Sequence, residues 1–191
     1  MINEPIIIVA GEPNSIFLEI FFKSIKIQKY KSPLILITSK KLLKQQMKRL
    51  GFFFKINTID RNFTEFKKLN NKKINLINVE YKFNNCFEKI SNKSSNFIKE
   101  SFKIGLEIIH QNKFSKFING PVSKKHFLQG KILGITEYLA IKTKKNKVAM
   151  LIFNKNLSVS PLTTHIPLKN VHKEISKQKL YTHVKLINSF Y

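Results

Sequence analysis

The sequence has a single cysteine, few acidic residues, and no apolar run long enough to cross a membrane. Because Cys86 has no second cysteine to pair with, an internal disulfide is excluded, which fits a reducing compartment. The strongest apolar run, Pro5 to Gly11, has the length of a strand. The N-terminus lacks the basic and long apolar segments of a secretory signal. We therefore expect a cytoplasmic protein that does not enter membranes.

Acidic residues number 11 against 35 basic ones, giving a formal net charge of +24. Such a charge raises the hypothesis of a basic nucleic-acid-binding module. Arginine, the preferred residue for bidentate phosphate and guanine contacts, occurs only as Arg49 and Arg61. Lys, Ile, Asn and Phe, which all have A/T-rich codons, make up 96 of the 191 residues, and the lysines are spread along the chain. We favour compositional drift as the cause of the charge, with nucleic-acid binding as the less favoured alternative.

Glycine is also scarce, and strand-like and helix-like segments alternate, which predicts an α/β fold with a largely parallel sheet. In the first half, strands are expected at 5–10 and 33–38, each followed by a helix, at 16–27 and 39–50. Ser39 and Gly51 have the residue types that begin and end a helix. Weaker strands are expected at 54–59 and 74–79, with a loop at 61–73.

The second half predicts a helix capped by Ser94 or Ser95, because Ile98, Phe102 and Leu106 follow at helical spacing. A strand is expected at 114–119, ending in a Gly-Pro turn. Two further strands, at 148–153 and 157–162, are expected to be joined by a turn at 154–156. A basic helix from about 176 to 190 reaches the C-terminus. A length of 191 residues suits one large domain or one and a half small ones.

Three loops follow predicted strands, where open α/β sheets place their ligands. The loop at 11–16 has one glycine and no Gly-Lys-Ser/Thr, so it is neither a P-loop nor a dinucleotide fingerprint, and a structural turn is favoured. In the loop at 119–126, Lys124 is a candidate for an anionic substrate group, although one lysine among many favours a solvated side chain. In the loop at 163–168, His165 is a candidate metal ligand, although a lone histidine is more commonly structural.

Taken in order, these segments resemble the 4-hydroxythreonine-4-phosphate dehydrogenase family. The matching pieces are Gly11-Glu12-Pro13, Gly120-Pro121 with Lys124, Gly134-Ile135-Thr136-Glu137, and Thr163-Thr164-His165-Ile166-Pro167-Leu168. The resemblance implies the two-lobed α/β/α fold of isocitrate and isopropylmalate dehydrogenases, with the C-terminal part missing. Residues from about 1 to 120 would form the first lobe, and residues 121–191 would begin the second.

The resemblance also implies a function. The family oxidises and decarboxylates 4-phosphooxy-L-threonine with NAD, giving 3-amino-2-oxopropyl phosphate for pyridoxal phosphate (vitamin B6) synthesis. It uses a divalent metal (zinc, magnesium or cobalt) and works as a homodimer. By its motifs, Thr136 contacts the substrate, Lys124 is a weaker substrate-side candidate, and His165 is one of three metal-ligating histidines. No cofactor-binding residue can be assigned.

This chain departs from the family pattern at several positions. Ile135 stands where the family has a substrate-binding histidine, and Ser15 and Phe17 replace glycines of the first loop. Nothing after His165 matches the other two metal histidines. We therefore expect the isolated chain to be inactive as a dehydrogenase and an apolar face of its sheet to be uncovered. A non-catalytic binding or dimerising relative is the main alternative.

Overall fold

The computed structural model describes residues 3–191, which form two compact units, one that ends at Gln129 and one that spans Gly130–Tyr191. The first unit has the order β1 (Ile6–Val9), α1 (Phe17–Ile27), β2 (Leu34–Thr38), α2 (Lys40–Arg49), β3 (Ile56–Ile59), η1 (Phe66–Lys68), β4 (Ile74–Asn78), η2 (Asn92–Ser94), α3 (Ser95–Asn112), β5 (Phe117–Asn119) and η3 (Lys124–Leu128). The division between the units follows η3, a short π-helix.

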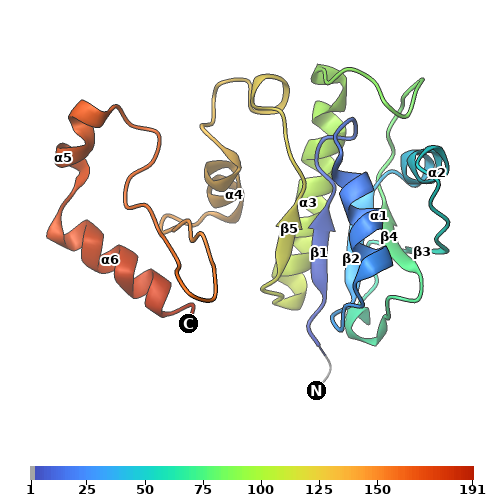
Figure 1. Cartoon of the computed structure of the whole chain (residues 1–191), viewed down its shortest axis with the longest axis horizontal. Helices are drawn as coiled ribbons and strands as arrows, with labels where there is room; N and C mark the ends of the chain where they lie inside the picture. The colour runs from blue at the N-terminus through green and yellow to red at the C-terminus, as the bar shows by residue number, and fades with distance from the viewer. Residues whose placement is uncertain (1–2) are drawn as a thin grey trace. The chain divides into compact units, whose positions relative to one another are not determined.

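The first unit is an α/β fold around a five-stranded sheet with the order β3-β4-β2-β1-β5 (Figure 1). All four strand pairings are parallel. The predicted architecture is thereby confirmed, and each predicted strand of this half is present, some shorter than expected. Because parallel strands start and end together, every loop that follows a strand lies at one edge of the sheet.

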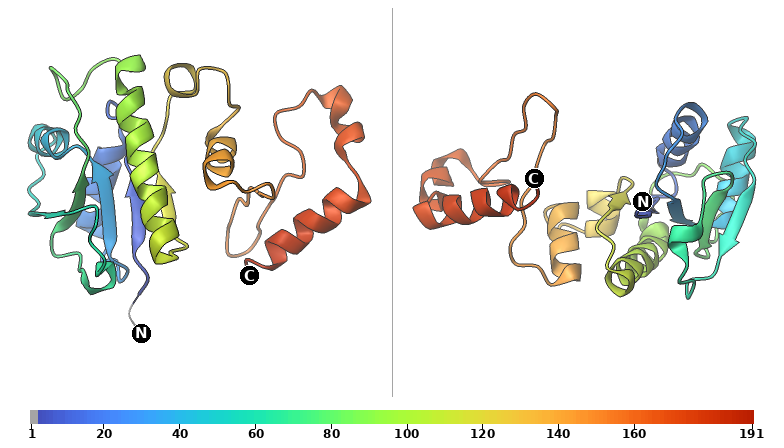
Figure 2. Two further views of the ribbon diagram at one scale, coloured as in Figure 1. Left: turned by 180° about the vertical axis from the view of Figure 1, so that it is seen from behind. Right: turned by 90° about the horizontal axis from the view of Figure 1, so that it is seen from below.

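Helices cover both faces of this sheet, as the view in Figure 1 and the view from behind in Figure 2 show together. Ile8, Leu36 and Leu76 face α1 and α2, and form a buried cluster with residues such as Phe22 and Leu43. The alternate strand residues face α3, where Gly105 brings the helix backbone close to the side chains of β1 and β2. Burial on both faces explains why these strands are continuous apolar runs rather than alternating ones.

The N-cap hydrogen bond expected from the sequence is present in α2 and absent from α3. The hydroxyl of Ser39 accepts a hydrogen bond from Leu42 N, as an N-cap should, and Gly51 follows α2 with a φ of +72°. Ser94 occupies the N-cap position of α3, one of the two positions predicted, but its hydroxyl makes no hydrogen bond to the first turn of that helix. The hydroxyls of Ser94 and Ser95 each bond to a distant segment instead.

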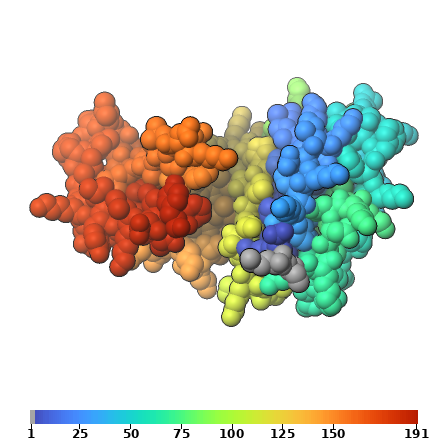
Figure 3. Space-filling view, turned by 60° about the horizontal axis from the view of Figure 1, so that its bottom comes forward, coloured from blue at the N-terminus to red at the C-terminus, as the bar shows by residue number. Residues whose placement is uncertain are grey.

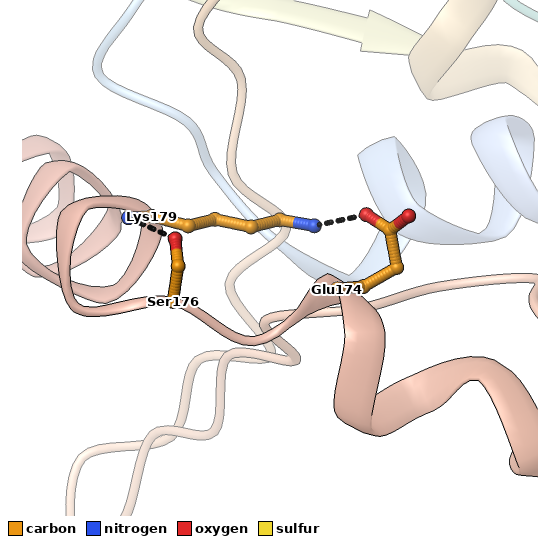
Figure 4. Close-up of polar contacts among 3 residues, drawn as sticks. All are labelled: Glu174, Ser176 and Lys179. Carbon is orange, nitrogen blue, oxygen red and sulfur yellow. Dashed lines mark hydrogen bonds and ion pairs between the residues drawn. The ribbon is translucent and has the colours of Figure 1, made fainter.

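The second unit contains α4 (Ile135–Thr143), η4 (Leu168–Asn170), α5 (Val171–Glu174) and α6 (Lys177–Asn188). The two strands predicted at 148–153 and 157–162 are wrong: a single antiparallel bridge joins Ile152 to Val159. Figure 4 shows the start of α6, where the Ser176 hydroxyl accepts from Lys179 N and the Lys179 ammonium pairs with Glu174 at 3.1 Å.

Apolar burial differs sharply between the units. Phe22, Phe66 and Phe102 are completely buried in the first unit, whereas Tyr138 is the one buried apolar side chain described in the second. Exposed apolar side chains gather in the second unit. On the sheet, the expected uncovered apolar surface is limited to the edge strand β5, where Ile118 is 45% exposed. Within residues 3–191, no helix combines the length and apolar character needed to span a membrane.

Candidate functional site

Two loops meet at the carboxyl edge of the sheet, one following β1 and the other following β5. Gly120 N donates to Val9 O at 2.7 Å, and Glu12 N donates to Pro121 O at 2.8 Å. A Cβ on Gly120 would lie 2.0 Å from Ala10 O, and one on Gly11, whose φ is +73°, would lie 2.4 Å from Pro121 O. The two glycines are therefore required for the close approach of the two backbones.

Glu12 is a buried carboxylate at the centre of this edge, with 3% of its surface exposed. One carboxylate oxygen accepts from the Ser94 hydroxyl at 2.8 Å, and the other accepts from Asn14 N at 3.3 Å. A buried charge needs such donors to offset its desolvation. Glu12 thereby ties the loop after β1 to the start of α3.

Most backbone N–H groups of the loop after β1 are hydrogen-bonded within the protein. The N–H groups of Glu12, Asn14, Ser15 and Phe17 all donate to oxygen atoms of the protein, so they are not presented to a ligand. Gly11 is the one residue of this loop with positive φ. Ser15 and Phe17 therefore replace glycines at positions that need no left-handed conformation here. This agrees with the interpretation of this segment as a turn.

Lys124 is the first residue of η3, directly after the loop that follows β5. The preceding Ser123 hydroxyl accepts from His126 N at 3.2 Å, and the Ser95 hydroxyl donates to His126 O at 3.0 Å. These contacts fix the backbone of η3 against the start of α3. The Lys124 side chain is exposed, and no acidic partner for it is found among the described residues.

An open cavity of about 270 Å³ lies beside this edge, where β2 and β4 end. It is lined by charged and aromatic groups: Lys41, Lys82, Lys93, Glu80, Glu88, Tyr81, Phe83 and Asn84. Backbone hydrogen bonds from Asn85 and Asn84 lower the pKa of the Glu88 carboxyl, and burial raises the pKa of Tyr81. Lysines and carboxylates are mixed around the cavity, so it does not select one sign of charge.

Thr136 lies in the second unit, in the first turn of α4. Gly134 precedes the helix without a side-chain cap, so the first-turn N–H groups have no capping side chain. Thr136 is half-buried, and its hydroxyl makes no hydrogen bond within the described part of the chain. This position suits contact with an anionic or polar ligand, because a helix N-terminus favours negative charge. The neighbouring Ile135 adds no polar group.

His165 also lies in the second unit, exposed and with a φ of +57°. Residues 3–191 contain no group of three or more His, Cys, Asp or Glu side chains that could hold a metal ion. The donor set described here therefore does not fit a divalent metal. Lys124 belongs to one unit and Thr136 and His165 to the other, and no hydrogen bond between described residues joins Thr136 to His165.

Sequence reasoning missed the side chains that hold the carboxyl edge together. Gln46 in α2 donates to Pro13 O at 2.9 Å and to Cys86 O at 2.7 Å, and the Asn14 amide oxygen accepts from Glu88 N at 3.0 Å. These partners are separated by more than thirty positions in the chain, so no local pattern marks them. The one available signal was a polar glutamine on the apolar face of α2.

Comparison with known proteins places these features in a family. The family model of the pyridoxal phosphate biosynthetic protein PdxA matches residues 29–191. A 4-hydroxythreonine-4-phosphate dehydrogenase of Sulfurihydrogenibium sp. (strain YO3AOP1) is 30% identical over 95% of this chain and 56% of its own length. One from Colwellia psychrerythraea is 26% identical over 97% of this chain and 57% of its own. The chain thus spans a little over half the length of these curated relatives.

Solved structures share the fold. A 4-hydroxythreonine-4-phosphate dehydrogenase from Burkholderia phymatum superimposes with a TM-score of 0.78 at 22% identity, over 96% of this chain and 57% of the other. One from Klebsiella pneumoniae gives 0.82 at 17% identity, over 98% and 58%. The family model covers most of the chain, and the motif order and parallel sheet agree with it. The chain therefore belongs to the family of the pyridoxal phosphate biosynthetic protein PdxA.

Proposed function

We propose that this chain provides the substrate-side part of a 4-hydroxythreonine-4-phosphate dehydrogenase. The whole enzyme would oxidise 4-phosphooxy-L-threonine with NAD, and loss of carbon dioxide would give 3-amino-2-oxopropyl phosphate for pyridoxal phosphate synthesis. Family membership supports this reaction class. In this proposal residues from about 1 to 120 are the first lobe and residues 121–191 begin the second, and the protein works in the cytoplasm as a homodimer.

The observation that carries the proposal is the position of Thr136 in the first turn of α4. A hydroxyl there, beside uncapped backbone N–H groups, is suited to bind a polar, negatively charged substrate. Lys124, in the first unit, is proposed separately as the weaker substrate-side residue, since its ammonium group is suited to pair with a phosphate as a mobile point charge. Each residue is assigned substrate binding, and neither moves a proton in the oxidation.

His165 would be one ligand of the divalent metal (zinc, magnesium or cobalt) in the whole enzyme. One imidazole does not hold such an ion, and the described residues offer no group of three donors. The metal, when bound, would act as a Lewis acid toward the substrate hydroxyl. We therefore expect the 191-residue chain, assayed alone, to bind substrate without producing NADH.

The first experiment separates binding from turnover. Calorimetric titration of the purified chain with 4-phosphooxy-L-threonine should give saturable binding, while absorbance at 340 nm with NAD and zinc should stay flat. Substitution Thr136→Val should weaken binding about tenfold, because a hydrogen bond to a charged ligand is lost. Thr143→Val on the same helix is the matched control, since that hydroxyl bonds to Leu139 O. Equal losses in both variants would contradict the role given to Thr136.

The second experiment tests the phosphate contact. Lys124→Gln should weaken binding of the phosphorylated substrate while leaving the affinity for unphosphorylated 4-hydroxythreonine unchanged. Lys125→Gln removes the same charge one position away and should have little effect on either ligand. If both lysine variants behave alike, the effect comes from the general positive charge of the chain rather than from Lys124.

A non-catalytic relative is the second candidate function, favoured by Ile135 in place of a family histidine and by the absence of three clustered donors among the described residues. In this case the wild-type chain would not bind 4-phosphooxy-L-threonine, and Ile135→His would not create affinity for it. A gain of affinity in Ile135→His would instead support an altered dehydrogenase. Sedimentation velocity of the wild-type chain would report whether it forms the proposed dimer.

A further inference from the structure

A second cavity in the first unit lies at the amino edge of the sheet, the edge opposite the candidate functional site. Its volume is about 460 Å³. It lies between the second half of α1, the connection from α1 to β2, and the segment that leads into β4. In Figure 3, which brings this end forward, the blue atoms of α1 lie beside the cyan-to-green part of the chain. The volume is in the range of small-molecule sites.

The floor of this cavity is apolar. It is formed by side chains from three elements and from the connection between α2 and β3: Phe21, Ile25, Leu34, Phe54 and Ile74. Phe21, Leu34 and Ile74 are themselves at least nine-tenths buried, so the floor is continuous with the core between the sheet and α1. Apolar surface of this kind gains free energy when a ligand displaces water from it.

The wall of the cavity is fixed before any ligand arrives. The Asn71 amide oxygen accepts from Leu34 N at 2.9 Å, and its amide nitrogen donates to Tyr30 O at 2.9 Å and to Ser32 O at 2.8 Å. Asn75, which is 2% exposed, donates to Leu34 O at 3.2 Å. A preformed wall lowers the entropic cost of binding.

Positive charge surrounds the opening. Lys29, Lys72 and Lys73 line the cavity, and no acidic side chain does. All three lysines are exposed, and none forms an ion pair within residues 3–191. The nearby backbone N–H groups of Leu34, Lys72 and Ile74 already donate within the protein. These three N–H groups are therefore not available to cradle a phosphate, and the charged groups that line the cavity are the lysine ammonium groups.

We propose that this cavity binds a small amphipathic carboxylate, with its hydrocarbon chain on the apolar floor and its carboxylate among Lys29, Lys72 and Lys73. A cavity toward the lower end of the small-molecule range suits a chain of about eight to ten carbons. The apolar floor distinguishes such a ligand from nucleic acid, which needs a charged groove with stacking surfaces. This site is independent of the dehydrogenase reaction, because it lies at the other edge of the sheet.

Calorimetric titration of the purified chain with decanoate, kept below its micelle concentration, tests the proposal. Saturable binding of one decanoate per chain is expected. Lys72→Gln/Lys73→Gln should weaken it at least about threefold, the effect of losing two partly screened charge contacts. Lys44→Gln/Lys48→Gln removes the same charge from the exposed face of α2 and should leave the affinity unchanged. Equal losses in the two double variants, or no saturable binding, would overturn the proposal.

Two further ligands and a mapping step distinguish this cavity from general binding of amphiphiles to the surface of the chain. Decyltrimethylammonium has the same chain with the opposite charge, and should bind at least tenfold more weakly than decanoate. Inorganic phosphate should not compete. A photoreactive diazirine analogue of decanoate should label peptides that contain Phe21–Tyr30 or Phe54, as read by mass spectrometry. Labelling confined to residues 130–191, where exposed apolar side chains gather, or equal affinity for the cationic amphiphile, would reject the site.

Discussion

At the scale of single residues, Thr38 has a buried hydroxyl group without a hydrogen-bond partner among the described residues. It ends β2 and is completely buried. Buried polar groups in native proteins are nearly always paired, because an unpaired one loses its hydration without compensation. The side chain is otherwise a good strand residue, since its β-branched shape fits a pleated, buried surface.

We expect Thr38→Val to stabilise the chain by about 1 kcal/mol, because valine has nearly the same shape without the orphan hydroxyl. Urea unfolding followed by circular dichroism would measure the change in the free energy of unfolding. Thr58→Val, at an exposed position in β3, is the matched control and should stay within about 0.5 kcal/mol of the wild type. A destabilised Thr38→Val would mean that the hydroxyl has a partner, such as a bound water.

Substitution of Gly120 should destabilise the chain, in contrast to Thr38→Val, because a single added methyl group would clash with backbone atoms. A Cβ there lies 2.0 Å from Ala10 O and 2.6 Å from Ala10 C. We expect Gly120→Ala to lower the free energy of unfolding by about 3 kcal/mol or more. Gly51→Ala, where φ is +72° but no atom lies within 4 Å, should lose only about 1 kcal/mol. Similar losses in the two variants would show that the loops can separate without cost.

At the scale of elements, Glu4 links the segment that leads into β1 to the segment that leads into β5. Its carboxylate accepts hydrogen bonds from the backbone N–H of Ser115 and from the Ser115 hydroxyl. These bonds, the backbone one foremost, lower the pKa of Glu4 below its ordinary 4.5. The folded state therefore binds fewer protons at this site than the unfolded state, so the contact stabilises above pH 4.5 and is lost as the pH falls.

We expect Glu4→Gln to destabilise the chain at pH 7 by less than about 1 kcal/mol, a small effect because solvent screens the site. The difference in the free energy of unfolding between Glu4→Gln and the wild type should shrink as the pH falls below 4.5. The Glu4 carboxyl then becomes neutral, like the glutamine amide that replaces it. Urea unfolding of both proteins at a series of pH values would measure this difference in the free energy of unfolding. Glu107→Gln, on the exposed side of α3, should show no such convergence. A difference that grows on acidification would contradict the assignment.

The elements also show what a sequence can predict. Strands at 5–10 and 33–38 were predictable because continuous β-branched and leucine-rich runs mark burial on both faces. The strands expected at 148–153 and 157–162 did not form beyond one bridge, since an isolated hairpin without further strands or a packing helix is only marginally stable. The π-helix at 124–128 has no sequence signature, and it depends on Ser95 binding His126 O.

The short motifs of the candidate site could be recognised in the sequence, but the hydrogen bonds between residues far apart in the chain could not. Thr136 and His165 could be singled out because each stands in a short pattern, but whether a metal site or a substrate site is assembled depends on residues far away in the chain. Glu12 shows this well: its burial and its bond to Ser94 join positions 82 apart in the sequence. Neither neighbour of Glu12 in the sequence signals that contact.

At the scale of the whole molecule, the two units differ in how much apolar surface they bury. Local stability follows buried contacts, so the first unit should resist opening far better than the second. Bonds such as that between Ser160 and His183, at 2.7 Å, hold the second unit together with polar contacts that water can replace. Exposed apolar side chains on α6, including Leu180 and Val184, add a surface available for association.

We expect brief digestion with trypsin to cut first at Lys131 and at lysines beyond it, leaving a protected fragment that ends near Gln129. Mass spectrometry of the products over time would identify the fragment. Addition of 4-phosphooxy-L-threonine should slow cleavage after Lys142 and Lys144, which flank the end of α4. Early cuts at Lys23 or Lys48 in the first unit would show that the sheet is no more stable than the rest.

The place of β1 in the sheet has a consequence for synthesis of the chain. β1 is made before β2, which pairs with one of its edges soon afterward, but its other edge pairs with β5, whose residues are made more than one hundred positions later. At usual translation speeds this interval is on the order of ten seconds. Throughout it, one edge of a strand composed of Ile and Val has no partner. Protection of that edge on the ribosome, for example by a chaperone, would therefore matter more to the yield of folded protein than the final stability of the sheet.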